Sequence, residues 1–190
     1  MTRARTIRWK PAGGEGIEHL EFRHDGGRDG DCITARSVVV GARGGVPYGL
    51  GYRIDLTEDW RVRTVELSLT GGAGLRLSSD GAGNWRDADG KPLPAFNGCL
   101  FPDISATPFT NTLPIRRLGL AIGESARIRV LYLPVPSLVL EVVEQRYTRL
   151  AERRWLYEGL FRGFQAELEV DGDGIVLDYP ETFLRIAPEA

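Results

Sequence analysis

Cysteine and histidine are scarce in this chain, which limits the cross-links and metal sites that it can form. Two cysteines, Cys32 and Cys99, and two histidines, His19 and His24, occur in 190 residues. A disulfide-rich scaffold is excluded, and reduced thiols are expected, as in most cytoplasmic proteins. Because His19 and His24 are an odd number of positions apart, they point to opposite faces of a regular strand. We therefore predict no metal site.

Long apolar runs and an excess of charge of one sign are also missing. No stretch approaches the roughly 18 apolar residues of a transmembrane helix. A secretory signal requires an apolar segment after a basic N-terminus, and none follows here. The net charge of −2, from 24 basic and 26 acidic residues, argues against a general nucleic-acid binder. The glycines after Val40 lack the spacing of a dinucleotide-binding loop, so no cofactor is predicted. We expect a cytoplasmic protein.

Turn-forming residues are abundant and divide the chain into short alternating segments. The sequence has 24 glycines and 11 prolines. The glycine pair Gly71-Gly72 separates two alternating apolar runs, which is typical of a β-hairpin, and residues 25–31 (DGGRDGD) predict a polar turn. Roughly twelve short strands without a long linker favour one domain over residues 1–190. The predicted fold class is mainly β, a many-stranded antiparallel sheet around one short helix.

The helix is predicted within residues 107–118, TPFTNTLPIRRL. Asn111 and Thr112 are suitable N-caps because their side chains accept hydrogen bonds from free backbone amides, and proline is tolerated early in a helix. Gly119 or Gly123 is expected to end it. Two or three turns are marginal alone in water, so we expect the sheet to curl around this helix.

Residues 138–160 fit two interpretations. The segment contains good helix formers, and Val139, Val142, Val143, Tyr147 and Leu150 would form a helical stripe. Its β-branched and aromatic residues favour strands instead. We prefer a hairpin that turns near residues 151–152 and keep a helix as the alternative.

Arg116 and Arg117 are the most informative charges, because they lie on the predicted internal helix. A buried arginine needs a partner. Asp103 would supply it in a salt bridge, or a ligand phosphate, carboxylate or sugar hydroxyl would do so. Trp85 is a candidate for contact with a sugar or acyl chain, although tryptophans in β-proteins are more often core residues. Glu18, His19 and Asp103 are the acid–base groups available to an enzyme.

The helical segment and several shorter pieces resemble the glycolipid-binding family. Beside TPFTNTLPIRRL, these pieces are residues 18–19 (EH), 83–85 (GNW), 98–99 (GC), 145–147 (QRY), 170–171 (VD) and 178–180 (DYP). The resemblance implies a spiral β-roll wrapped around one helix, a tight homodimer, and a cleft between helix and sheet that takes a glycolipid.

Two functions follow as hypotheses. We prefer non-enzymatic binding of a glycolipid or similar amphiphile in that cleft, with Arg116, Arg117, Asn111, Asp103 and Trp85 as ligand-binding residues and no catalytic residues. The alternative is an enzyme of unknown reaction acting on a small polar substrate through Glu18, His19 and Asp103.

Overall fold

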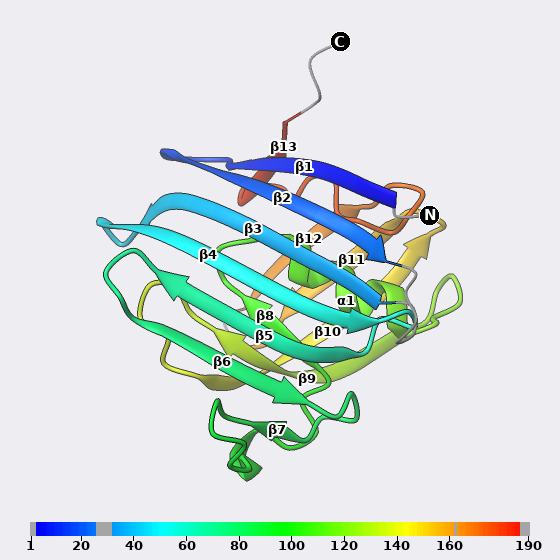
Figure 1. The fold of residues 1–190 in the computed structure, drawn as a ribbon. Coiled ribbons are helices and arrows are strands. Elements are labelled where there is room, and N and C mark those ends of the chain that lie inside the picture. Colours follow the sequence, from blue (N-terminus) through cyan, green and yellow to red (C-terminus); the bar gives the residue numbers. More distant parts are fainter. Residues whose placement is uncertain (1–2, 26–31, 162, 187–190) are drawn as a thin grey trace.

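The computed structural model describes residues 3–25, 32–161 and 163–186, and it contains two β-sheets with a helix packed in the space between them (Figure 1). The mainly β fold class predicted from the sequence is confirmed. Most of the glycine turn predicted at 25–31 lies outside the described residues. The order along the eight-stranded sheet is β13 (Phe183–Arg185), β1 (Arg3–Pro11), β2 (Gly16–Asp25), β3 (Cys32–Arg43), β4 (Val46–Thr57), β5 (Val62–Leu69), β6 (Gly74–Ser79) and β7 (Trp85–Arg86).

The second sheet has five strands and one parallel pairing. Its order is β12 (Phe164–Glu169), β11 (Arg154–Gly159), β10 (Glu141–Ala151), β9 (Ser125–Leu133) and β8 (Phe101–Ile104). Strands β8 and β9 run parallel, which departs from the antiparallel prediction. Parallel neighbours need a crossover connection, and here the crossover contains the helix.

The core follows from the alternation of side chains along the strands. In β4, Leu50, Tyr52, Ile54 and Leu56 are buried, whereas the residues between them are half-buried on the other face. These side chains meet the facing sheet and the helix in one apolar cluster. Phe109 of the helix is fully buried there, and burial of such a ring contributes about 2 kcal/mol. The helix is thus fixed by packing, as its short length requires.

The helix α1 spans Phe109–Arg117 and begins earlier than the sequence predicts. Asn111 and Thr112 are therefore inside the helix and are not its N-caps. The hydroxyl oxygen of Thr107 accepts a 3.0 Å hydrogen bond from the backbone amide of Phe109, so this threonine satisfies the first helical donor. The helix ends before Gly119, whose φ of 62° lies in the left-handed region, as predicted.

Residues 138–160 form the preferred hairpin and not a helix. Strands β10 and β11 pair antiparallel, with Tyr147 opposite Tyr157, and a bulge lies between Arg149 and Ala151. The hairpin turns at residues 152–153, next to the predicted position. A short 3-10 helix at Pro94–Phe96, which the sequence did not suggest, precedes β8.

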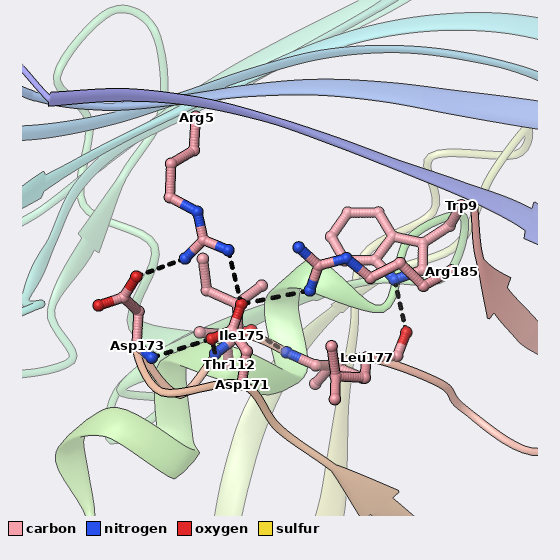
Figure 2. Close-up of polar contacts among 9 residues, drawn as sticks. Arg5, Trp9, Thr112, Asp171, Asp173, Ile175, Leu177 and Arg185 are labelled. Carbon is pink, nitrogen blue, oxygen red and sulfur yellow. Dashed lines mark hydrogen bonds and ion pairs between the residues drawn. The ribbon is translucent and has the colours of Figure 1, made fainter. Parts of the chain in front are cut away.

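The turn after β12 is tied to the large sheet by two arginines (Figure 2). Arg5 of β1 forms ion pairs with Asp171, at 2.7 Å, and with Asp173, and Arg185 of β13 approaches Asp171 at 3.3 Å. The other oxygen of Asp171 accepts hydrogen bonds from the backbone amides of Asp173 and Ile175. Burial alone would raise the pKa of Asp171, but these donors together hold it below its usual value. The turn is thus fixed against the sheet.

Candidate functional site

A cleft of about 400 Å³ opens beside the N-terminal half of α1. Both sheets and the helix contribute to its lining, so it lies where the chain's main layers meet. A volume of this size is within the range of small-molecule sites. The lining residues are Arg43, Asp103, Ile104, Ser105, Thr107, Asn111, Tyr132, Tyr157, Gly159, Phe161, Phe164, Tyr179, Thr182 and Phe183.

The floor of the cleft is polar and internally hydrogen-bonded. Gln145 donates from Nε2 to Asp103 Oδ2 at 2.6 Å, and its Oε1 accepts from the hydroxyl of Tyr147 at 3.4 Å. That hydroxyl oxygen in turn accepts from Asn111 Nδ2 at 2.9 Å. The network joins β8, β10 and α1, and its buried members are fixed by satisfied hydrogen bonds.

The wall of the cleft is aromatic. The ring of Tyr179 lies 5.7 Å from that of Tyr157, 5.8 Å from Phe164 and 6.3 Å from Phe183, measured between centroids. Phe161 lies farther along the wall, against Tyr132 at 5.6 Å. Aromatic rings offer broad apolar faces with polar edges, so this wall suits a sugar face or an acyl chain.

A buried carboxylate lies directly behind the floor. Glu18 is only 2% exposed, and its Oε1 accepts from Tyr52 at 2.6 Å, Ser37 at 2.8 Å and Thr107 at 3.0 Å. Its Oε2 is buried without a hydrogen-bond partner in the described part of the chain. Burial raises the pKa of Glu18 from 4.5 to about 7, although the three hydroxyl donors oppose this shift.

One cation lies at the rim of the cleft. Arg43 donates to the backbone oxygen of Ser105 and to the hydroxyl of Tyr132, both at 3.2 Å. Among the described lining residues, Arg43 is basic and Asp103 is acidic. The arrangement can hydrogen-bond a hydroxyl-rich group while apolar parts of a ligand contact the rings. Within residues 3–25, 32–161 and 163–186, no cluster of three or more histidine, cysteine or acidic side chains could hold a metal ion.

The structure brings together two of the five predicted ligand-binding residues. Asp103 and Asn111 both line the cleft. Trp85 is a core residue elsewhere, 1% exposed, whose indole donates to the backbone oxygen of Cys99 at 2.7 Å. Arg116 and Arg117 are outside the cleft lining, near the other end of α1. Their roles in binding, and that of Trp85, stay predictions.

The salt bridge of Asp103 with Arg116 or Arg117, one of the two alternatives drawn from the sequence, does not form. Arg116 is exposed, and its guanidinium lies 5.0 Å from the ring centre of Trp60. Arg117 is half-buried near Asp59, whose pKa is lowered chiefly by hydrogen bonds from Thr57 and Arg61 and to a smaller extent by the charge of Arg117. The reason is the direction of the helix, since Asp103 lies beside its first turn and both arginines belong to its last.

The acid–base set of the alternative hypothesis is not assembled. Glu18 faces the interior, whereas its neighbour His19 is exposed on the outer face of the large sheet. Adjacent strand residues point to opposite faces, so the two side chains cannot act on one substrate atom. Asp103 lies on the other sheet.

Sequence reasoning missed most of the aromatic wall. The pattern around Tyr157, Phe164, Tyr179 and Phe183 indicates strands, and nothing local in it marks these rings as a common wall. The available signal was their concentration in the last third of the chain, after the only predicted helix. The preferred hairpin does not by itself fix the register that places Tyr157 opposite Tyr147 across β10 and β11.

The fold and the cleft define a class: a mainly β protein that holds an amphiphilic cleft between its sheets and one described helix. Residues 6–185 match the model of the family described as "Putative glycolipid-binding", and the chain belongs to this family. The crystal structure of a DUF1089 family protein from Pseudomonas aeruginosa is similar, with 42% sequence identity, a TM-score of 0.81, and coverage of 92% of this chain and 94% of that chain. Comparison with curated proteins gives no significant match.

Membership of the family supports a binding role in general. The helices of the described residues include none that is both long and apolar enough to cross a membrane. The resemblance on which the sequence analysis relied is confirmed by these comparisons.

Proposed function

We propose that the chain binds a glycolipid or a similar amphiphile in the cleft beside α1, without catalysing a reaction. The observation that carries this proposal is the union of a polar floor, formed around Asp103 and Asn111, with an aromatic wall centred on Tyr179. A ligand with hydroxyl groups at one end and hydrocarbon at the other matches both surfaces. A purely apolar ligand would match the wall alone and would remove water from the polar floor without replacing it.

The wall supplies most of the binding free energy in this proposal. Burial of apolar surface contributes about 25 cal/mol per Å² removed from water, and the rings of Phe161 and Phe183 are still partly exposed. The polar floor contributes orientation, because its groups already satisfy one another and bind a hydroxyl at little reorganisation cost. These engaged side chains favour a binding site over an acid–base centre.

Native mass spectrometry of the protein as purified, followed by organic extraction, tests this function. The expected result is additional mass that the extract identifies as an amphiphile carrying hydroxyl groups, or uptake of such a molecule from a total lipid extract. A protein that carries no added mass and takes up nothing from the extract would overturn the proposal.

We also propose that two copies associate through the outer face of the large sheet. Ile17, Val38 and Val40 are exposed there, Val38 by 62%, next to a shallow hollow over Gly51. Patches of exposed apolar side chains on a sheet face commonly mark contact surfaces. Charges of both signs surround this hollow, as a self-complementary two-fold interface requires. They are Glu21, Arg36, Arg53, Glu66 and Arg76.

A further inference from the structure

A second hollow lies at the opposite end of α1 from the cleft and shares no lining residue with it. Its volume is about 320 Å³. Three arginines line it: Arg116 from the last turn of α1, Arg149 from the end of β10, and Arg153 from the hairpin turn that follows. We call it the arginine hollow. Its distinguishing feature is a lining that includes three arginines, one from α1 and two from the β10–β11 hairpin.

None of these three arginines has a carboxylate partner within the described residues. Arg116 lies over the ring of Trp60. Arg149 lies 5.7 Å from the ring centre of Trp155 and donates to the backbone oxygen of Leu120 at 2.9 Å. The Nε of Arg149 is buried and has no acceptor in the described structure. A buried donor left without an acceptor is unfavourable, and the two other nitrogens of this guanidinium are the ones that an oxyanion in the hollow would contact.

The acidic groups around the arginine hollow oppose an anion only weakly. Asp171 lines it, but the carboxylate is already paired with Arg5 and Arg185 (Figure 2). Glu152 belongs to the exposed hairpin turn. The C-terminal end of α1 also lies at the hollow, and a helix C-terminus carries roughly half a negative charge. The positive charge of three guanidinium groups is larger than this.

The remaining lining strengthens the effect of those charges. Ile115, Trp155 and Val170 form a buried apolar floor, and an apolar surface beneath a charge lowers the local dielectric constant. The backbone at Gly172 and Gly174 carries no side chain, and a Cβ at Gly174 would come within 2.7 Å of Arg116 Cδ. The absence of a side chain at Gly174 thus leaves room for the side chain of Arg116 beside the turn that follows β12.

We propose that the arginine hollow binds a phosphate group, either as free phosphate or as part of a lipid headgroup. Guanidinium groups bind phosphate oxygens through paired N–H donors, and stacking on Trp60 and Trp155 orients two of the three forks in advance. This site is independent of the amphiphile cleft.

Calorimetric titration of the full chain with inorganic phosphate at low ionic strength, where charge interactions are least screened, tests the proposal. A parallel arm uses vesicles containing phosphatidic acid. We compare Arg116→Gln and Arg153→Gln with Arg63→Gln, which removes an arginine of β5 that is also exposed. The expected result is saturable binding that weakens at least about tenfold in each hollow variant and changes less than about twofold in the control.

The two arms separate the sources of phosphate. Binding of inorganic phosphate with this pattern of losses supports a site for the free anion, and binding of the vesicles alone with the same pattern supports a lipid headgroup. Absence of binding in both arms would overturn the proposal, as would equal weakening in Arg63→Gln or unchanged affinity in both hollow variants. Because Arg116 and Arg153 are exposed, thermal melts are expected to match that of the wild type.

Discussion

The hydroxyl of Thr107 donates a 3.0 Å hydrogen bond to Oε1 of Glu18, although 89 positions separate these residues in the chain. The oxygen of the same hydroxyl accepts from the backbone amide of Phe109, the first residue of α1. Thr107 also lines the cleft. One side chain therefore connects a buried carboxylate in the large sheet, the start of the helix and the proposed ligand site.

Glu18 is expected to make stability depend on pH in the direction opposite to that of most carboxylates. Its pKa is raised by burial from 4.5 to about 7, so the folded state prefers the protonated form. The stabilisation is fully present below pH 4.5 and is lost as pH rises through 7. A shift of this size corresponds to roughly 3 kcal/mol.

Urea unfolding of the wild type and of Glu18→Gln, followed from acidic to slightly alkaline pH, measures this effect. The variant lacks the titrating group, so the decrease in its free energy of unfolding with rising pH should be smaller by up to roughly 3 kcal/mol. Glu21→Gln, on the same strand but half-exposed, is the matched control and should follow the wild type. Identical profiles for all three proteins would show that Glu18 does not titrate in this range.

Thr107→Val should destabilise the protein by about 1 to 2 kcal/mol. Valine has nearly the shape of threonine, but it cannot accept the hydrogen bond from the backbone amide of Phe109 or donate one to Glu18. Chemical denaturation measures the change in the free energy of unfolding. Thr148→Val on β10 is the control, because exchanging one β-branched residue for another at a half-buried strand position is expected to leave stability unchanged. Equal stability of the two variants would contradict the capping role of Thr107.

Gly119→Ala should cost about 1 kcal/mol, since φ at this position is 62° and an alanine there is strained even in open space. Gly71→Ala provides the comparison, because its Cβ would also meet nothing within 4 Å, and its φ is not in the left-handed region. Thermal unfolding of both variants separates the strain of the left-handed backbone at position 119 from the general effect of replacing glycine by alanine in open space. Unchanged stability of Gly119→Ala would mean that the backbone at the end of α1 can leave the left-handed conformation without cost.

The strands and the hairpin at 138–160 could be read from the sequence, because alternation such as that of Leu50, Tyr52, Ile54 and Leu56 is a local property. The start of α1 could not, because its capping residue Thr107 is recognised only once its bonds to Glu18 and Phe109 are known. Asn111 was predicted as a site residue through the helical motif, and Asp103 as the acidic residue that precedes it. Tyr179 was missed because its role depends on rings brought from β11, β12 and β13.

Val38→Lys should convert a dimer into a monomer, because a charge would be buried in the proposed apolar contact on the outer face of the large sheet. Light scattering coupled to size-exclusion chromatography measures the mass. Val139→Lys changes a residue with nearly the same exposure, 64% against 62%, outside that face. A wild-type monomer, or equal effects of both substitutions, would contradict the interface.

If the cleft beside α1 holds the ligand, a bulky side chain that obstructs the cleft should prevent binding. Thr182 lines the cleft at its half-buried edge, and its backbone oxygen, which accepts from Ala12, is unaffected by the side chain. Thr182→Trp should therefore fill the opening without unfolding the protein.

We would incubate the wild type, Thr182→Trp and Val139→Trp with the same lipid extract and record native mass spectra. Val139→Trp adds a ring of equal size at an exposed position outside the cleft. We expect the mass of a bound amphiphile on the wild type and on Val139→Trp, and its absence from Thr182→Trp, which should remain folded. Equal loading of all three proteins would contradict binding in this cleft.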